Sequence, residues 1–571
     1  MDKHDFVIRF AGEGGQGLVT SADALAKAAA RAGYFVQTHS TFPSQIMGGP
    51  ASSQVRISTT PVLSSGDGVD VLVALNQYAY DNHNTDLNPG GVTVYNAEEF
   101  DLPEGGNYFG INADELAKST GNARAANMVT IGAVANLIDF NVEEIDAFIT
   151  QRFTRGRSGD EEIISANIKA VRLGLDVADQ SGLSVGQLSD PGSITQEQLM
   201  ITGNVALSLG FMAAGLEFYA GYPISPATTI LVWMENNLWG EGRFVHQVSS
   251  EIEAINAVVG AGFAGKKAMT ATAGPGFTLM SEGLGLAWMA EIPLVVTNVQ
   301  RGGPATGLPT KSEQSDLYTC IHPAHGDIKM PILAPGTVEE CFYAGALATN
   351  WAERFQGPVI LISEFSLAER GENIRKPDLN EINNEKRSTV NENSTGKRYD
   401  SWDGMTPLPG MPIPGGPGAY VANGSEHDEI GDTTHLPRHH TRLTARRFKK
   451  LDLLDGAHYE IENADAGVII MPWGSSKGPA REAYDKLRDR GENLGWLYSV
   501  ALHPLPEEVA AVLKSADIII VPELNYLGQW SAILRQEGYR AESITQFTGL
   551  PFKPGDLSER ITERISGRVT A

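Results

Sequence analysis

Two periods of hydrophobic and polar positions alternate along this chain. Apolar runs of about four to eight residues predict buried strands, and alanine-rich segments with apolar residues three or four apart predict helices. Strands that alternate with helices are typical of open α/β sheets. The sequence therefore predicts an α/β protein with three open α/β domains.

The first domain is placed at residues 1–185. It opens with the strand segment FVIRFAG, a glycine loop and the helical segment SADALAKAAARAG, and further strands are predicted at VLVAL and VTVYN. The second domain is placed at residues 195–370, with strands at FYAGYP, FVHQV, KAMTATA, PLVVTNV and PVILIS. A polar stretch between them predicts a linker.

Residues 371–455 show little periodicity and contain the asparagine-rich EINNEKRSTVNENSTG and the run PLPGMPIPGGPG. Such a segment buries little apolar surface by itself, so it predicts an extended connector that lies over its neighbours. The third domain is placed at residues 456–571, with strands at GVIIMPWG, LGWLYSV and ADIIIVPEL.

Composition narrows the function. The chain has 571 residues, 69 acidic against 44 basic, for a net charge of −25. That surface disfavours nucleic acid and anionic membranes, and no apolar run is long enough to span a bilayer. The N-terminus does not read as a signal peptide. Only Cys320 and Cys341 are present, so this chain cannot supply four thiolates to an iron–sulfur cluster, and the cytoplasm is the expected location.

One segment carries candidate chemistry. Ser250 and Glu253 have capping-box spacing, which predicts Glu253 as the capping acid of a helix. Glu251 would lie in the first turn, where an acid is also favoured electrostatically without any function. Small residues at 254–262 leave a slim helix face, and the strand after it leads into Gly274-Pro275-Gly276.

This order resembles the pyrimidine-binding half of thiamine diphosphate enzymes. Three motifs in sequence resemble signatures of the 2-oxoacid:ferredoxin oxidoreductases, and most closely the alpha subunits that act on 2-oxoglutarate. They are Tyr222-Pro-Ile-Ser-Pro226, Glu251-x-x-Ala254, and Gln300-Arg-Gly-Gly-Pro-Ala-Thr-Gly307 with the LPTKSEQSDL segment after it.

The resemblance implies roles for individual residues. Glu251 would hold a proton against the cofactor's pyrimidine nitrogen in an apolar pocket that raises its pKa. Tyr222, Pro223, Gly274 and Pro275 would also contact the cofactor.

Two further residues are candidates for the substrate carboxylate. Ser225 precedes Pro226, which suits the first helical position, so Ser225 is predicted to be a helix N-cap. Arg301 follows a strand end, where ligands gather in open sheets, and a guanidinium matches a carboxylate. A cap alone and a surface ion pair are the structural alternatives. The resemblance implies that both bind the 2-oxoacid carboxylate, although the family more often has threonine at 225, and that Thr310 and Lys311 contact the substrate side chain.

Gly66-Asp67-Gly68 imitates a motif that binds Mg²⁺ and diphosphate, but the residues after it predict a strand, where that motif requires a helix. No metal site is therefore assigned to this chain. The resemblance implies that Mg²⁺, the diphosphate site and a 4Fe–4S cluster lie on a beta subunit, with ferredoxin as electron acceptor and coenzyme A as co-substrate.

Other motifs fit the same family. The loop Gly12–Gly17 and the segment 48–58 resemble its gamma domain, which would serve coenzyme A binding or only assembly. Segments 474–478 and 522–529 resemble its transketolase-C-like domain, interpreted as scaffold and dimer contact. His427, flanked by acids, is interpreted as solvated charge rather than a metal ligand.

The resemblance implies oxidative decarboxylation of 2-oxoglutarate to succinyl-CoA, CO2 and reduced ferredoxin, or the reverse CO2-fixing reaction of a reductive cycle, in a cytoplasmic heterotetramer. Pyruvate or branched 2-oxoacids are alternative substrates. A non-oxidative thiamine enzyme and a non-catalytic scaffold subunit are alternative functions.

Overall fold

The computed structural model describes residues 2–43, 48–103, 105–192, 196–390, 397–402, 404–405 and 407–569. The chain forms two compact units. The first contains residues 1–201, 369–376 and 553–556, and the second contains the rest of the chain.

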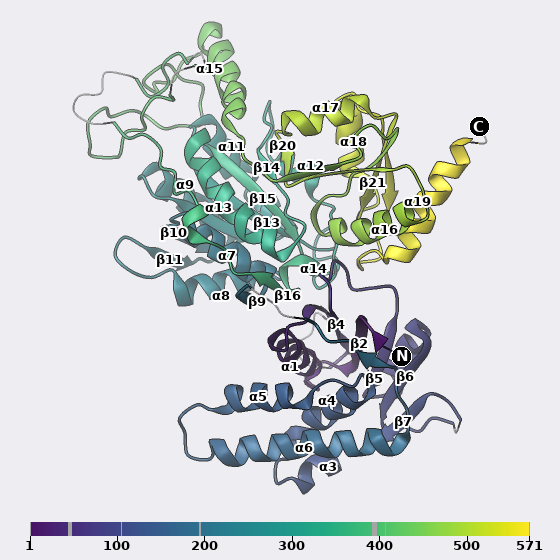
Figure 1. Cartoon of the computed structure of the whole chain (residues 1–571). Helices are drawn as coiled ribbons and strands as arrows, with labels where there is room; N and C mark the ends of the chain where they lie inside the picture. The colour runs from purple at the N-terminus through teal and green to yellow at the C-terminus, as the bar shows by residue number, and fades with distance from the viewer. Residues whose placement is uncertain are drawn as a thin grey trace. The chain divides into compact units, whose positions relative to one another are not determined.

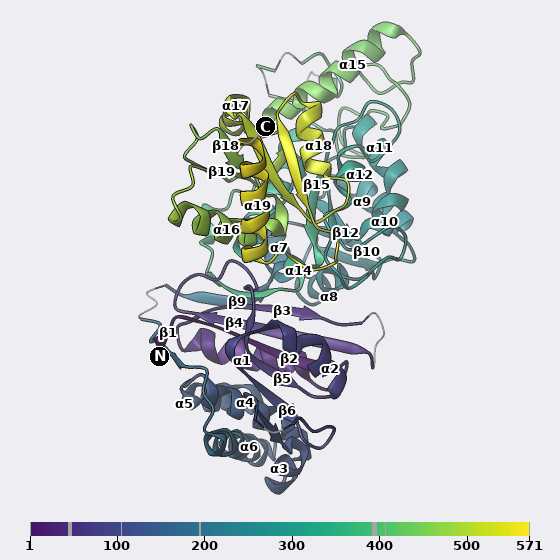
Figure 2. The same ribbon diagram turned by 90° about the vertical axis from the view of Figure 1, so that its right-hand side faces the viewer.

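The first unit is built on an eight-stranded mixed sheet with the order β7-β6-β5-β2-β4-β3-β16-β9 (Figures 1 and 2). Its strands are β2 (Asp5–Glu13), β3 (Phe35–Thr41), β4 (Pro50–Ser58), β5 (Val69–Ala74), β6 (Leu87–Asn96), β7 (Tyr108–Ile111), β9 (Gln198–Thr202) and β16 (Gly371–Arg375). The strands and helices predicted in this region are confirmed, and the start of the predicted second domain contributes the edge strand β9 to the first unit's sheet.

Alternation along β2 explains why helices cover both faces of this sheet. Phe6, Ile8 and Phe10 pack into the larger core with α1 (Leu18–Arg31), α4 (Ala126–Leu137) and α5 (Val142–Phe153). Val7 and Ala11 point the other way, into a smaller core with Ala79 of α2 (Gln77–His83). The long helix α6 (Asp160–Ser181) packs on α4, where a Cβ at Gly174 would lie 1.9 Å from the Val129 carbonyl oxygen.

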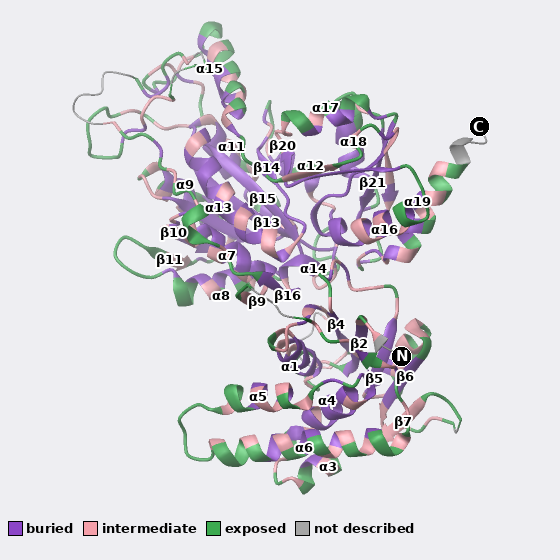
Figure 3. Ribbon diagram, viewed as in Figure 1, coloured by how far each residue is buried: buried purple, intermediate pink, exposed green. Residues whose placement is uncertain are grey.

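In the second unit, a seven-stranded sheet has the order β11-β10-β12-β13-β15-β14-β20 and is parallel except at β20. Its strands are β10 (Phe218–Gly221), β11 (Phe244–Gln247), β12 (Ala268–Thr272), β13 (Leu294–Gln300), β14 (Ile332–Leu333), β15 (Pro358–Glu364) and β20 (Ala501–His503). Every residue of β12, β13 and β15 is buried (Figure 3). Strands buried on both faces read as continuous apolar runs, which is why the sequence predicts them well.

Helices α7 (Gly203–Ala213) and α13 (Val338–Phe355) pack against each other, while α9 (Glu251–Phe263) lies on β10 and β12 and contacts α11 (Ser281–Met289). The third predicted region forms a five-stranded sheet, β17-β19-β18-β21-β22, within the same unit. Its strands are β17 (Tyr459–Glu462), β18 (Val468–Ile470), β19 (Gly495–Ser499), β21 (Ile518–Glu523) and β22 (Ala541–Thr545), and its helices are α16 (Lys477–Asp489), α17 (Glu507–Ser515), α18 (Gln529–Gln536) and α19 (Pro554–Val569).

The predicted connector contains more regular structure than expected. Residues 371–375 form β16 of the first unit's sheet, and residues 437–449 form the helix α15 (Pro437–Lys449). The buried face of α15 carries His439, Leu443, Arg446 and Arg447 at helical spacing. A pattern of apolar residues does not reveal this helix, because basic side chains occupy most of its inner face. The asparagine-rich part of the prediction lies partly outside the described residues.

Candidate active site

Glu251 is the first residue of α9, directly after the N-cap Ser250, and only 6% of it is exposed. Ser250 Oγ accepts a hydrogen bond from the Glu253 N–H (3.3 Å), as the capping box predicts. The Glu253 carboxylate, however, accepts from the N–H and hydroxyl of Ser249 (2.8 and 2.6 Å), one residue earlier than the box requires. These hydrogen bonds lower the pKa of Glu253 and fix the start of the helix.

The Glu251 carboxylate has an environment that suits an external partner. It lies against Gly276, where a Cβ atom would come within 2.4 Å of Glu251 Oε1 and 2.1 Å of Thr272 Oγ1. Within the described part of the chain, no side chain or backbone group bonds this carboxylate. Because the residue is buried and its carboxylate is left free for an external partner, the position fits the ring nitrogen of a bound pyrimidine.

Ser225 and Arg301 are brought together, but not as a helix cap and its ligand. Helix α8 (Thr228–Asn237) begins three residues later, with Ala227 at its N-cap position and no side-chain cap. The predicted Ser225 N-cap is therefore wrong, because the Thr228 N–H already donates to the Ile224 carbonyl oxygen (3.0 Å). Instead, Arg301 Nη1 donates to the Ser225 carbonyl oxygen (2.7 Å), and the Ser225 side chain is exposed.

Arg301 itself is buried, with 8% exposed, at the end of β13. Burial lowers the pKa of its guanidinium, and the Asp316 carboxylate acts in the opposite direction. Its Nε is buried and has no hydrogen-bond partner among the described residues. The guanidinium thus keeps donor capacity for an anion.

Arg301 opens onto a cavity of about 610 Å³. Gly274 and Pro275, at the start of α10 (Gly274–Leu279), line it together with Asp316. The opposite wall comes from the third region, through Asn525 and Gln529 among others. Charged, hydroxyl and amide groups therefore converge on a space of the size that small ligands occupy.

The remaining predicted residues do not line this cavity. Thr310 and Lys311 close the loop after Arg301, where the Gly302 N–H donates to the Lys311 carbonyl oxygen (3.1 Å), but neither lines the cavity. Burial lowers the pKa of Lys311, and no carboxylate pairs with its Nζ within the described ranges. Tyr222, 41% exposed, and Pro223 lie at the surface after β10.

Sequence reasoning missed two contributions to the cavity. Asp316 stands in the LPTKSEQSDL segment, which served only as a family signature. The segment 522–529, interpreted as scaffold, contributes cavity residues instead, because Asn525 Nδ2 donates to the Gln314 carbonyl oxygen (3.0 Å) and Gln529 Nε2 to that of Ser315 (2.7 Å). The only available signal was polar side chains after a predicted strand, at β21.

Two other motifs have structural roles. Gly66-Asp67-Gly68 is followed by the strand β5, as predicted, and Asp67 Oδ1 accepts a hydrogen bond from the Gly555 N–H (2.6 Å). His427 is fully buried against the Tyr399 ring, 4.2 Å between centroids, so its interpretation as solvated charge is wrong. Burial lowers the pKa of His427 and favours the neutral imidazole.

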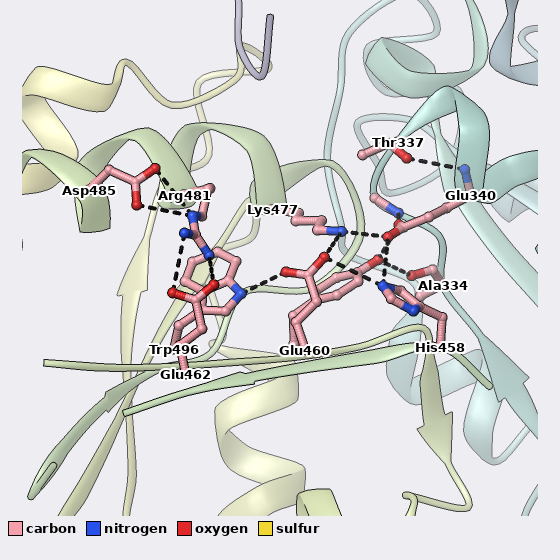
Figure 4. Close-up of polar contacts among 12 residues, drawn as sticks. Ala334, Thr337, Glu340, His458, Glu460, Glu462, Lys477, Arg481, Asp485 and Trp496 are labelled. Carbon is pink, nitrogen blue, oxygen red and sulfur yellow. Dashed lines mark hydrogen bonds and ion pairs between the residues drawn. The ribbon is translucent and has the colours of Figure 1, made fainter. Parts of the chain in front are cut away.

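Glu340, His458 and Glu460 form a group whose ligand atoms lie within 4.8 Å of one another (Figure 4). Lys477 Nζ stands between the two carboxylates, 2.5 Å from Glu340 Oε1 and 2.6 Å from Glu460 Oε1. The ammonium supplies the positive charge that these acids need. The group joins α13 to β17 and α16 as an ion-pair network, and the hydrogen bond to Glu460 raises the pKa of His458.

The glycine loop of the first unit is tied to the segment after residue 47. Gly14 N donates to the Gly49 carbonyl oxygen (3.0 Å) and Gly48 N to that of Gly14 (3.3 Å). Gly17, with φ of 79°, caps α1, and a Cβ there would lie 2.1 Å from Asn127 Nδ2.

Comparison with known proteins shows which protein families the three regions of the chain match. The family model for the thiamine diphosphate-binding domain of pyruvate flavodoxin/ferredoxin oxidoreductases matches residues 209–445. Models for pyruvate ferredoxin/flavodoxin oxidoreductase and for core domain II of pyruvate:ferredoxin oxidoreductase match residues 7–177 and 464–545.

The KorA subunit of 2-oxoglutarate oxidoreductase from Mycobacterium tuberculosis is 31% identical over 99% of this chain and 92% of its own length. The alpha subunit of 2-oxoacid:ferredoxin oxidoreductase 1 from Aeropyrum pernix is 30% identical over 99% and 98%. A solved structure of 2-oxoglutarate:ferredoxin oxidoreductase from Magnetococcus marinus, with 2-oxoglutarate, coenzyme A and succinyl-CoA bound, superposes with a TM-score of 0.92 at 36% identity over 99% of this chain and 100% of that one. No described helix is long and apolar enough to cross a membrane.

Proposed function

Because the chain belongs to the 2-oxoacid:ferredoxin oxidoreductase family, we propose that it is the alpha subunit, with a fused gamma-like domain, of a 2-oxoglutarate:ferredoxin oxidoreductase. The reaction is the oxidative decarboxylation of 2-oxoglutarate with coenzyme A to succinyl-CoA, CO2 and reduced ferredoxin, together with its reverse. End-to-end similarity to proteins named for 2-oxoglutarate supports this substrate over pyruvate and branched 2-oxoacids.

The observation that carries the proposal is the carboxyl of the buried residue Glu251. It has no protein partner in the described residues, and Gly276 beside it leaves space that a side chain would fill. Thiamine diphosphate, when bound, supplies the carbon nucleophile and accepts the electron pair that decarboxylation releases. Glu251 would hold a proton at the pyrimidine nitrogen, beside Tyr222, Pro223, Gly274 and Pro275. Its placement at the first position of a capped helix keeps the carboxyl group at one fixed point.

Arg301 and Ser225 would bind the 2-oxoacid carboxylate. The hydrogen bond between Arg301 and the Ser225 backbone orients the guanidinium and leaves its buried Nε available. Lys311, half-buried and without a carboxylate partner among the described residues, would attract the distal carboxylate of 2-oxoglutarate, with Thr310 beside it.

The partner would be a beta subunit that carries Mg²⁺, the diphosphate site and a 4Fe–4S cluster, in a cytoplasmic heterotetramer that reduces ferredoxin. Exposed apolar side chains beside Glu251 support docking on this side. Ile252 and Leu279 are 52% and 50% exposed. Both line a second cavity, of about 760 Å³, along α9 and α11.

The test is anaerobic co-expression of this chain with its beta subunit, followed by an assay of coenzyme A-dependent ferredoxin reduction. Glu251→Gln is expected to abolish turnover while the complex still assembles. Glu253→Gln, two residues later in the first turn of the same helix, is the matched control and is expected to remain active. Near-wild-type turnover in Glu251→Gln would disprove the assigned role, and a wild-type complex with higher kcat/KM for pyruvate would disprove the substrate.

A further inference from the structure

The two glycines of Gly274-Pro275-Gly276 each make room for a carboxyl group. A Cβ at Gly276 would meet Glu251, and a Cβ at Gly274 would lie 2.7 Å from Asp316 Oδ2 and 3.1 Å from Oδ1. The start of α10 is therefore packed between two acids. The proposed function uses only Glu251, so the role of Asp316 needs its own explanation.

Asp316 is held in one position by groups from β13. Asn298 Nδ2 donates to Asp316 Oδ2 (3.1 Å), and the Asp316 N–H donates to Gln300 Oε1 (3.0 Å). Both partners are fully buried. Because the carboxyl is fixed from its backbone and from its side chain, it presents a constant face to the cavity that it lines with Arg301.

The surroundings of Asp316 raise its pKa above the ordinary value of an aspartic acid. Burial raises its pKa, the Asn298 hydrogen bond opposes this, the nearby Glu313 carboxylate raises it further, and Arg301 lowers it. The Cys320 thiol also faces it, and burial keeps the pKa of that thiol well above its usual range, so the thiol stays neutral. Burial likewise raises the pKa of Glu313. The Arg301 guanidinium can then bind an anion, and a neutral acid beside it does not repel that anion.

We propose that Asp316 is a further catalytic residue, which gives a proton to the 2-oxo oxygen of the bound acid and takes it back when the carbonyl re-forms in the oxidation step. This rests on the function proposed above. When a carbon nucleophile adds to the 2-oxo carbon, the C=O π pair moves onto oxygen, and an O–H bond forms there as the Asp316 O–H bond breaks. After CO2 leaves, the former 2-oxo carbon gives up two electrons to ferredoxin, the acceptor in the proposed function. The carbonyl re-forms in that oxidation, and the proton on its oxygen returns to Asp316 before the acyl group passes to the thiol.

The geometry lowers the cost of both protonation states. As a carboxylate, Asp316 keeps the Asn298 hydrogen bond and faces the Arg301 charge. As an acid, it avoids a second negative charge next to a substrate that is itself anionic. Arg301 would bind the carboxylate of the substrate while Asp316 addresses its carbonyl oxygen, so one cavity edge would hold both groups of a 2-oxoacid.

The test compares Asp316→Asn with wild type in the complete complex with the beta subunit. General acid–base groups contribute about 10²–10⁴-fold, so kcat is expected to fall at least ~100-fold. The KM for 2-oxoglutarate is expected to stay within about threefold, because the lost interaction forms in the transition state. The wild-type kcat should fall at high pH as Asp316 loses its proton, and this limb should be absent in Asp316→Asn.

A second readout does not need turnover. The infrared difference between wild type and Asp316→Asn at neutral pH should contain the carbonyl stretch of a protonated carboxylic acid. Asn298→Ala removes a hydrogen bond that favours the charged form, so it should move the high-pH limb of kcat to higher pH. The shift of the high-pH limb in Asn298→Ala decides the matter if Asp316→Asn does not assemble.

Wild-type kcat in Asp316→Asn, a high-pH limb that persists in it, or an unchanged infrared spectrum would overturn the proposal. These outcomes are distinct from failure of the proposed function. In that case the wild-type complex itself would not turn over 2-oxoglutarate, or Glu251→Gln would remain active.

Discussion

Glycine at position 276 is required by its neighbours. A Cβ atom added at this position would collide with Glu251 Oε1 and Thr272 Oγ1, and both atoms belong to buried residues. We expect Gly276→Ala to displace the Glu251 carboxylate and to weaken thiamine diphosphate binding by tenfold or more, measured as the Kd of the cofactor for the complex.

The control for this variant lies on the same helix as Glu251. A Cβ at Gly260 would have open space, so Gly260→Ala should leave the Kd unchanged. It should also raise the free energy of unfolding slightly, since alanine is favoured over glycine within a helix. A Gly276→Ala complex with wild-type cofactor affinity would contradict the assigned packing.

Lys311 allows a test of substrate choice. Removal of a charge-assisted hydrogen bond costs about 1.5–3 kcal/mol, so Lys311→Ala should raise the KM for 2-oxoglutarate by about tenfold or more. Because pyruvate lacks the distal carboxylate, its KM should not change. Equal KM values for 2-oxoglutarate in the variant and in wild type would assign the second carboxylate to another group.

At this scale the sequence predicts residue identity better than contacts. Glu251 and Arg301 lie where helix-start and strand-end patterns place them. Ser225 was predicted as a cap and instead offers its carbonyl oxygen to Arg301, a contact between residues far apart in sequence. Asp316 was missed, because its significance comes from Gly274 and Asn298 and not from its neighbours in the chain.

Helix α15 is attached to the second unit by a buried charge network. Glu291 is 1% exposed, and its carboxylate forms ion pairs with Lys450 Nζ (2.9 Å) and Arg446 Nη2 (3.2 Å). Arg398 donates to the Glu291 carbonyl oxygen (2.7 Å). These cations hold the pKa of the Glu291 carboxyl well below its usual value, although burial acts in the opposite direction. The strongly polar sequence of this helix is explained by that network.

Breaking the network should destabilise the second unit. Glu291→Gln leaves buried cations without their anion, which costs about 3–5 kcal/mol. A lowered carboxyl pKa stabilises the folded state at pH values above the pKa of the unfolded state, near ~4.3. That stabilisation is lost as pH falls. The difference in urea midpoint between the variant and wild type should therefore be large at pH 7 and shrink below about pH 4.

The exposed pair Lys449–Asp452 provides the comparison for that experiment. Surface pairs contribute about 0–1 kcal/mol, so Asp452→Asn should shift the midpoint little. Equal effects of Glu291→Gln and Asp452→Asn would show that the buried network does not hold α15 in place.

On the scale of the whole chain, periodicity predicts strands and helices well but does not show which unit a segment joins. Residues 369–376 belong to the first unit although the second intervenes, and β16 lies between β3 and β9. Asn373 secures it, since its Oδ1 accepts from the Val36 N–H (2.7 Å) and its Nδ2 donates to the Tyr34 carbonyl oxygen (3.0 Å). Nothing local in GENIR indicates a strand of a distant sheet.

This arrangement predicts the behaviour of the isolated first unit. A fragment of residues 1–201 leaves β3 as an open edge, and such edges favour aggregation. We expect light scattering to show aggregation of this fragment and less aggregation when residues 369–376 are joined to it by a flexible linker. Asn373→Ala in the joined form should be intermediate. A monodisperse 1–201 fragment would show that β16 is dispensable.

The position of β16 also has a consequence for synthesis on the ribosome. The first 201 residues emerge early, but their missing strand follows roughly 170 residues later. At about 5–20 residues per second, the nascent N-terminal unit waits on the order of ten to thirty seconds with an unfinished sheet. During that interval the growing chain exposes unpaired backbone groups along β3, which chaperones would have to shield. The order of translation therefore sets when this protein is most prone to aggregate.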